Sequence, residues 1–257
     1  MTRIAVLGLG EAGALIAADL AAAGASVSGF DPVRSLDGID NRGSDADAVR
    51  DADLVLSVNS SHDALPALEM SLPALRPGTI WADLNTAAPS VKATLADRAG
   101  PDIPVADVAL MSPVPGRGLR TPMLVSGPAA RAYSDLMTGL GAQVSVQDGP
   151  AGEAISRKLL RSVFYKGLAA AVVEALAAAE KAGCEPWLRE NISAELAGFD
   201  ERTIDRLVDG THRHARRRAD EMTAAAAQLD DLGVPPRIAA AARDLLIDLR
   251  DGGSHDH

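Results

Sequence analysis

A short glycine pattern near the start of the chain limits its fold more than any other feature. The apolar segment RIAVLG runs into the pattern GLGEAG at residues 8–13, and an alanine-rich stretch then continues to Gly24. The apolar segment predicts a buried strand, and the alanine-rich stretch predicts a helix that ends at Gly24. Glycines at these spacings allow a strand, a tight turn and a helix to pack closely together. This combination is typical of the first unit of a sheet covered by helices.

The alternation of apolar and helical segments continues through the first half of the chain. Further strands are predicted at 25–31, 53–58, 78–84, 103–110 and 142–147, and helices at 44–52, 62–72, 88–100 and 128–141. The segment 111–127 is rich in proline and glycine, and it reads as a loop that returns into a strand. Strands that alternate with helices predict a doubly wound parallel sheet covered on both faces.

The composition changes after Pro150. No proline occurs from Ala151 to Lys181, and this stretch is rich in alanine. It predicts one helix of ~30 residues and ~45 Å. Shorter helices are predicted at 185–196, 200–208, 212–232 and 236–250. We therefore expect an α/β domain of the Rossmann type at residues 1–150 and an all-α domain at residues 151–257, with a long interdomain helix.

The glycine pattern also predicts a ligand. Gly8 permits the tight turn, Gly10 lets a pyrophosphate approach the backbone, and Gly13 lets the helix pack against the sheet. The helix N-terminus offers N–H groups and a positive dipole to an anion. Asp31 ends the second predicted strand, where an acid should accept hydrogen bonds from a ribose, and its carboxylate would repel a 2′-phosphate. This favours NAD over NADP, although Arg34 softens that preference and leaves NADP possible.

Two further pairs of polar residues follow predicted strands. Asn59 and Ser60 end the third strand, and Asn85 and Thr86 end the fourth. The carboxyl ends of parallel strands form the edge at which such a cofactor binds. The predicted cofactor-binding residues are Gly8, Leu9, Gly10, Glu11, Ala12, Gly13, Asp31, Pro32, Arg34, Asn59, Ser60, Asn85 and Thr86.

Charge and cysteine content exclude several classes of protein. The formal charge is −10 and the pI about 4.9, which argues against nucleic acid or an anionic membrane as a partner. Cys184 is the only cysteine, so neither an internal disulfide nor a Cys/His metal cluster is expected, and a reducing cytoplasm is favoured. Glu11 interrupts the N-terminal apolar run, which argues against a signal peptide. No apolar run approaches the ~18 residues of a membrane span.

Taken in order, these segments resemble the superfamily of 3-hydroxyacid dehydrogenases and 6-phosphogluconate dehydrogenase, which also includes imine reductases. The resemblance covers about residues 4–182. It is carried by the glycine pattern at 8–13, DLNTAAP at 83–89, MSPVPG at 111–116, TPMLVSG at 121–127 and GEAISRK at 152–158. The chain also resembles a phosphogluconate-dehydrogenase-like branch of undefined substrate, through GEAG at 10–13, RSVFYKG at 161–167 and ARRRADEM at 215–222.

The resemblance implies roles for several residues. Lys158 takes the place of the catalytic lysine, Ser112 lies in the substrate loop, and residues 83–89 lie beside the nicotinamide. The long helix is similar to the helix through which family members form dimers, which implies a homodimer. Ser112 is followed by Pro113 and Val114, whereas the family usually has two glycines whose amides approach a carboxylate, and proline has no N–H to donate.

Two residues on the long helix differ from the residues that the family usually has. Ser162 stands where the family usually has asparagine, and Tyr165 stands where phosphogluconate dehydrogenases have a glutamate acid. These changes argue against 6-phosphogluconate itself as the substrate. On a helix, Lys158, Ser162, Tyr165 and Lys166 share one face, so they form a polar stripe on an otherwise apolar helix.

Lys158 is the residue that we expect to carry the chemistry. A desolvated lysine can exchange a proton near neutral pH, whereas arginine stays protonated. Ser162 and Tyr165 can hydrogen-bond a substrate oxygen, and Lys166 can bind a carboxylate or replace Lys158 as the acid. Arg161 is either a clamp for a substrate anion or a surface arginine.

These features predict an NAD(P)-dependent dehydrogenase or reductase. Hydride would pass between the nicotinamide and a small hydroxy or keto substrate, with acidic substrates favoured, and Lys158 would exchange the proton. Two alternatives stay open at this point. One is a reductase of C=N bonds, with Tyr165 or Lys166 as the acid. The other is a sensor that binds NAD(P) without turnover, because the substrate loop is altered and the asparagine is missing.

Overall fold

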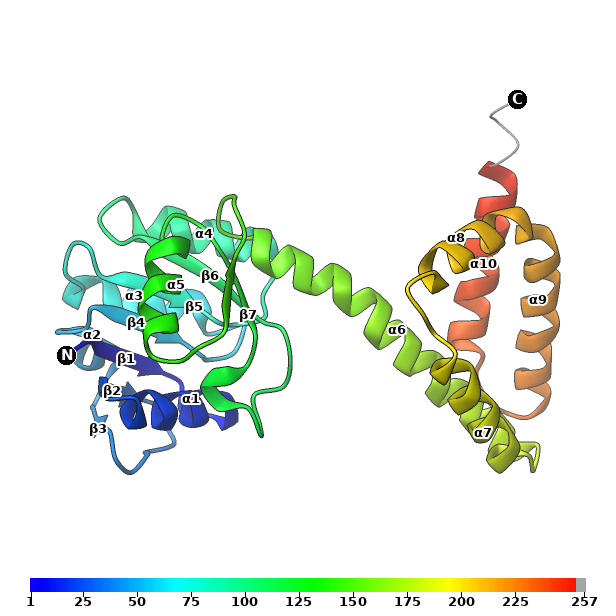
Figure 1. Ribbon diagram of the computed structural model, residues 1–257, viewed down its shortest axis with the longest axis horizontal. Helices are drawn as coiled ribbons and strands as arrows, with labels where there is room; N and C mark the ends of the chain where they lie inside the picture. Colours follow the sequence, from blue (N-terminus) through cyan, green and yellow to red (C-terminus); the bar gives the residue numbers. More distant parts are fainter. Residues whose placement is uncertain (253–257) are drawn as a thin grey trace. The chain divides into compact units, whose positions relative to one another are not determined.

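The computed structural model describes residues 1–252, and it divides into two compact units, Met1–Arg161 and Ser162–His257. The strands of the first unit form an eight-stranded sheet in the order β3-β2-β1-β4-β5-β6-β7-β8 (Figure 1). Their bounds are β1 Arg3–Leu7, β2 Ser26–Phe30, β3 Asp40–Asn41, β4 Leu54–Ser57, β5 Ile80–Asp83, β6 Val105–Leu110, β7 Met123–Ser126 and β8 Val144–Val146. This confirms the predicted α/β sheet.

Two strands differ in direction from the prediction of a parallel sheet, because β7 runs antiparallel to β6, and β8 pairs in parallel with β7. All neighbouring strands pair in parallel except β6 and β7, which pair antiparallel. The connection between them is the predicted proline- and glycine-rich loop, which contains only the short 3₁₀ helix η2, Gly118–Arg120. A parallel pair needs a crossover of a dozen or more residues, usually a helix, whereas an antiparallel pair does not.

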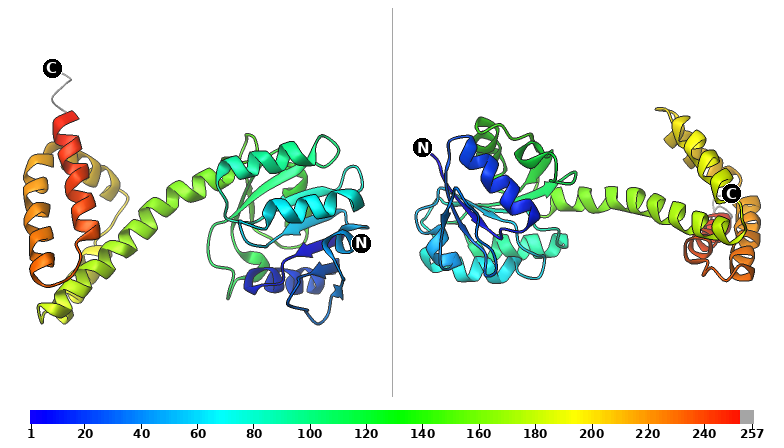
Figure 2. Two further views of the ribbon diagram at one scale, coloured as in Figure 1. Left: turned by 180° about the vertical axis from the view of Figure 1, so that it is seen from behind. Right: turned by 90° about the horizontal axis from the view of Figure 1, so that it is seen from below.

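Helices cover both faces of this sheet. Their bounds are α1 Glu11–Ala22, α2 Asp45–Val49, α3 Ala64–Ser71, the 3₁₀ helix η1 Leu72–Ala74, α4 Pro89–Ala99 and α5 Ala130–Gly139. Ile16 and Leu20 of α1 share one buried apolar cluster with Tyr133 of α5. Leu68 of α3 and Leu95 of α4 belong to a second cluster against the opposite face. The two views in Figure 2 show these layers on either side of the strands.

The order of the strands places the reversal point of the sheet at β1 and β4. From β1 the chain first builds β2 and β3 on one side, and it then crosses to β4 and continues on the other side. In doubly wound sheets the carboxyl ends of the two central strands leave a crevice at this point, and ligands bind there. Gly8 follows β1 and Asn59 lies just after β4, so both belong to this edge.

The second unit is helical. It contains most of α6, Glu153–Lys181, and the helices α7 Glu185–Ala197, α8 Thr203–Arg213, α9 Ala215–Asp231 and α10 Arg237–Gly252. The predicted long helix and the shorter helices are therefore present. Glu174 of α6 accepts hydrogen bonds from the backbone N–H groups of Ile238 and Ala239, at 2.8–3.1 Å, at the start of α10. A carboxylate at a helix N-terminus is favourable because of the helix dipole.

Helix α6 is unusually long and apolar. By length and composition alone it could cross a membrane, because an 18-residue window within it has a mean hydropathy of 1.4 with at most two charged residues. The prediction that no apolar run approaches the length of a membrane span therefore does not hold for this helix. One such helix is weak support for a membrane span, since helices of other proteins pass the same test.

Candidate cofactor and catalytic site

The glycine turn after β1 has a geometry that only glycine allows. Gly8 has a φ of +90°, and a Cβ there would lie 2.5 Å from Asn59 Oδ1. A Cβ on Gly13 would lie 1.9 Å from the carbonyl oxygen of Gly8, so this glycine permits α1 to approach the turn. At Gly10, the N-cap of α1, a Cβ would meet only Arg34 Nη1 at 4.0 Å. The turn is therefore crowded on its inner side and open at Gly10.

A pocket of about 560 Å³ lies against this turn. Its lining residues come from the turn, from the end of β2 and from the end of β4: Gly8, Gly10, Glu11, Asp31, Pro32, Val33, Arg34, Val58, Asn59, Ser60 and Asp63. The pocket thus brings together most of the cofactor-binding residues predicted from the sequence. The other five predicted residues do not line it: Leu9, Ala12, Gly13, Asn85 and Thr86. Leu9 and Ala12 pack in the apolar core, and Gly13 is buried against Gly8.

Asp31 is held in place by the backbone around it. One carboxylate oxygen accepts a hydrogen bond from the N–H of Leu9 at 2.9 Å, and the other accepts from Val33 at 2.9 Å and Arg34 at 3.0 Å. The carboxylate therefore links the glycine turn to the loop after β2. The Arg34 side chain lies near Gly10, so an acid and a base both border the pocket where a ribose would lie.

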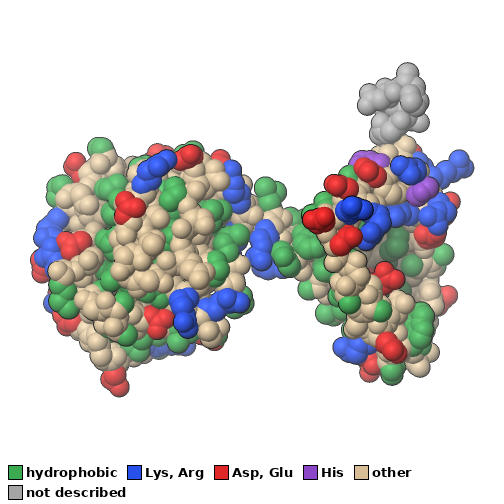
Figure 3. All heavy atoms as spheres, viewed as in Figure 1, with side chains coloured by type: hydrophobic (Ala, Val, Ile, Leu, Met, Phe, Trp, Pro, Cys, Tyr) green, Lys and Arg blue, Asp and Glu red, His purple; other side chains and the backbone are tan. Residues whose placement is uncertain are grey.

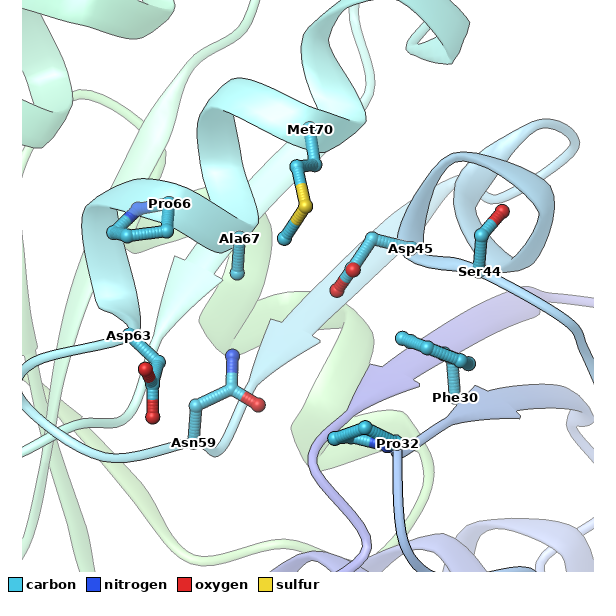
Figure 4. Close-up of a pocket in the computed structure, with 9 residues that line it drawn as sticks. All are labelled: Phe30, Pro32, Ser44, Asp45, Asn59, Asp63, Pro66, Ala67 and Met70. Carbon is cyan, nitrogen blue, oxygen red and sulfur yellow. The ribbon is translucent and has the colours of Figure 1, made fainter.

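A second pocket, of about 400 Å³, shares Pro32, Asn59 and Asp63 with the first. Figure 4 shows its lining residues, which are Phe30, Pro32, Ser44, Asp45, Asn59, Asp63, Pro66, Ala67 and Met70. The Asp45 carboxylate points from α2 into this pocket, and burial raises the pKa of that carboxyl. A mostly apolar slot beside the ribose position suits a flat aromatic ring such as adenine.

The sequence did not reveal this second pocket. Ser44 and Asp45 begin α2, and Ala67 and Met70 lie on α3, which are separate segments of the chain. Ser44 begins the helix predicted at 44–52, and its hydroxyl caps α2 by accepting a hydrogen bond from the N–H of Asp47 at 3.2 Å. That α2 and α3 border one pocket depends on how the two helices pack on the sheet.

The catalytic candidate Lys158 contacts the loop after β5. Its Nζ donates a hydrogen bond to Thr86 Oγ1 at 2.9 Å. The neighbouring Asn85 is buried, and its Nδ2 donates to Ser57 Oγ at 3.0 Å and to Asp83 Oδ1 at 2.5 Å. Asn85 Oδ1 has no hydrogen-bond partner among the described residues. The structure thus brings together Lys158 and the two residues predicted to follow the fourth strand.

Arg161 lies one turn further along α6. Its Nη1 donates a hydrogen bond to the carbonyl oxygen of Met111 at 2.9 Å, so it holds the backbone of the predicted substrate loop. The next residue, Ser112, has a buried hydroxyl with no hydrogen-bond partner within residues 1–252. Arg161 therefore reaches the loop that was predicted to bind substrate, and its proposed contact with a substrate anion stays a prediction.

The other three candidates lie in the second unit. Ser162, Tyr165 and Lys166 follow Arg161 on the next turns of α6. Tyr165 is exposed, and its ring packs edge-on against Phe164 with the centroids 5.1 Å apart. Their catalytic or substrate-binding roles stay predictions.

The comparisons with known proteins agree with this geometry. Residues 3–103 match the NAD-binding domain of 6-phosphogluconate dehydrogenase, and residues 179–248 match a domain of unknown function, DUF1932. No curated protein matches the chain.

Three solved structures share its fold. A conserved hypothetical protein from Sinorhizobium meliloti is 28% identical, with a TM-score of 0.63, and the match covers 96% of this chain and 88% of that one. A conserved protein of unknown function, described as structurally similar to 3-hydroxyacid dehydrogenases, is 26% identical, with a TM-score of 0.63 and coverages of 96% and 98%. The imine reductase of Streptomyces aurantiacus is 21% identical, with a TM-score of 0.78 and coverages of 98% and 95%.

The matched range contains β1, the glycine turn, Asp31, both pockets and Thr86. Both the resemblance predicted from the motifs and the predicted nucleotide cofactor are therefore confirmed. Residues 3–103 of this chain match the NAD-binding domain of 6-phosphogluconate dehydrogenase, and the chain shares its fold with a protein described as similar to 3-hydroxyacid dehydrogenases and with an imine reductase.

Proposed function

We propose that this protein is an NAD(P)-dependent oxidoreductase that transfers hydride between the nicotinamide and a small hydroxy or keto acid. The observation that carries the proposal is the hydrogen bond from Lys158 Nζ to Thr86 Oγ1. It holds a titratable amine at the carboxyl edge of the sheet in an NAD(P)-binding domain. That edge is where the cofactor of such a domain lies.

Each part of the site has a task in this proposal. The glycine turn and the N-terminus of α1 hold the pyrophosphate, Asp31 accepts hydrogen bonds from the ribose, and the pocket beside Asp45 takes the adenine. The cofactor supplies the hydride when it is bound. Lys158 gives a proton to the substrate oxygen during reduction, or removes it during oxidation, while Thr86 orients the amine.

A second candidate is reduction of a C=N bond. Ser112 is followed by Pro113, which has no N–H to donate, so the loop has fewer amides for a substrate carboxylate than a loop with glycines. The imine reductase of Streptomyces aurantiacus shares the fold. In this case Tyr165 or Lys166 would protonate the nitrogen.

The test is a binding titration followed by a substrate screen. NADH and NADPH are titrated by their fluorescence, and we expect NADH to bind more tightly because of Asp31. Keto acids and cyclic imines are then tested for oxidation of the reduced cofactor, and hydroxy acids for the reverse reaction. Turnover of keto or hydroxy acids supports the main proposal, and turnover of imines alone supports the second. Tight cofactor binding without any turnover would overturn both and favour a sensor.

We also propose that the protein acts as a homodimer. Large apolar side chains are exposed along α6, α7 and α8, and Figure 3 shows hydrophobic side chains at the surface of this unit. They include Val163, Phe164, Val173, Trp187, Ile204 and Val208. Exposed large apolar side chains in this number are typical of an interaction site, and a second copy would cover them.

The dimer can be tested by light scattering on the purified chain. The expected mass is twice the 26.5 kDa of one copy, and Phe164→Asp is expected to shift it towards one copy. Lys181→Asp, a change on the last turn of the same helix, serves as the control. A wild-type mass of 26.5 kDa would contradict the proposal, as would solubility that depends on detergent.

A further inference from the structure

Three charged side chains are completely buried beneath the site. Lys92 of α4, Asp83 of β5 and Asp107 of β6 each have 0% side-chain exposure. Lys92 Nζ lies 2.5 Å from Asp83 Oδ2 and 3.2 Å from Asp107 Oδ1, and it donates a hydrogen bond to the backbone carbonyl of Asp83 at 2.8 Å. The two aspartates are direct partners in the pairing of β5 and β6. Burying such a cluster costs free energy, and apolar residues would often serve stability as well.

Asp107 connects this cluster to the start of α6. Its Oδ2 accepts hydrogen bonds from the N–H groups of Gly152 at 3.0 Å and Ile155 at 3.1 Å. Ser126 Oγ donates to the same oxygen at 3.2 Å and accepts from the N–H of Ala154 at 3.0 Å. Three backbone N–H groups at the N-terminus of α6 are thus satisfied by two buried side chains. The cluster carries one more negative than positive charge, which complements the positive end of the helix dipole.

Asp83 connects the same cluster to the loop after β5. Its Oδ1 accepts the hydrogen bond from Asn85 Nδ2, which also donates to Ser57 Oγ. Asn85 immediately precedes Thr86, the partner of Lys158. The loop and the helix that together hold the Lys158 amine are therefore both connected to one buried ion cluster.

We propose that Lys92, Asp83, Asp107 and Ser126 are positioning residues that set the distance between Thr86 and Lys158. They touch neither cofactor nor substrate. They hold the first turn of α6 and the loop after β5 in one rigid frame, and this frame places the Lys158 amine. The importance of that placement for catalysis rests on the proposed function, since a misplacement of about 1 Å can cost roughly 10²-fold in rate.

The proposal can be tested without knowledge of the substrate. The chain has few lysines, namely Lys92, Lys158, Lys166 and Lys181, so an amine-reactive reagent followed by peptide mass spectrometry reports on each one separately. Ser126→Ala and Asp107→Asn are compared with wild type. Ser71→Ala is the matched control, because Ser71 is also a fully buried serine, with one hydrogen bond, to Ala67 O at 2.7 Å. Thermal unfolding and NADH titration establish that each variant is folded.

We expect Ser126→Ala to change the labelling rate of Lys158 by roughly 2- to 30-fold, the range for coupling through a buried network. The rates of Lys166 and Lys181 should stay at the wild-type values, and Ser71→Ala should change none of them. If Asp107→Asn does not fold, Ser126→Ala decides the question. An unchanged Lys158 rate, or an equal change in Ser71→Ala, would overturn the proposal. A changed Lys158 rate in a protein that turns over no substrate would leave the positioning intact and overturn the proposed function.

Discussion

Lys158→Ala is expected to lower kcat by about 10²- to 10⁴-fold, the usual contribution of a general acid or base, while cofactor affinity changes little. The residue lies on α6 and contacts Thr86, but it does not line the pocket around the glycine turn. Loss of the amine should therefore remove proton transfer and leave NAD(P) binding intact. The measurement is turnover of the best substrate from the screen, together with the fluorescence titration of NADH.

Three further variants distinguish proton transfer by Lys158 from a role of its charge alone and from proton transfer by Lys166. Lys158→Arg keeps the positive charge but cannot release its proton, so it should be nearly as inactive as Lys158→Ala if proton transfer matters. Lys166→Ala tests the other lysine of the polar stripe, and Lys181→Ala is the control on the last turn of α6. If Lys158→Ala retains turnover and Lys166→Ala loses it, Lys166 rather than Lys158 is the acid.

Lys92→Met is expected to cost about 3–5 kcal/mol of unfolding free energy at neutral pH, as is usual when one partner of a buried ion pair is removed. Methionine fills a similar volume, so the loss reports the charge rather than a cavity. Asp83 and Asp107 would then face each other across β5 and β6 without the cation that lies between them. Denaturant unfolding measures the effect, and Lys181→Met is the control at an exposed lysine.

This loss should depend on pH. Burial raises the pKa of the Asp83 carboxyl above its usual value, and the charge and hydrogen bond of Lys92 oppose that rise. A folded-state pKa above the unfolded one means that the group favours folding at low pH, and that this contribution is lost as pH rises through the folded-state pKa. The deficit of Lys92→Met should thus shrink towards acidic pH. Adding Asp83→Asn should recover part of the stability at neutral pH, and no recovery would contradict the ion-cluster explanation.

Most elements of the fold could be predicted because their signals are local. The strand before Gly8, the helix from Glu11 and the long helix α6 are marked by apolar runs, alanine content and the positions of glycine and proline. β3 was missed because it consists of two exposed polar residues, Asp40 and Asn41, which have no apolar pattern. The reversed direction of β7 and β8 was missed because the direction of a strand depends on its pairing partner, which no short segment records.

Some residues of the candidate site could also be predicted from local patterns, whereas their contacts could not. Gly8, Gly10 and Asp31 could be predicted because the tight turn and the acid lie at recognisable spacings from one strand and one helix. Lys158 was found through the family resemblance. Arg161 was predicted as a clamp for an anion, and its hydrogen bond to the Met111 carbonyl became visible only in the folded chain.

By itself the sequence determined an NAD(P)-binding turn and the order of strands and helices, because each depends on residues close together along the chain. Only the tertiary structure decided which charged side chains are buried together beneath the site. Lys92 looks like an ordinary helix-surface lysine in the sequence, yet pairing of β5 with β6 places Asp83 and Asp107 directly against it. Buried charges are stabilised by partners that are distant in sequence, and those partners come together only when the sheet forms.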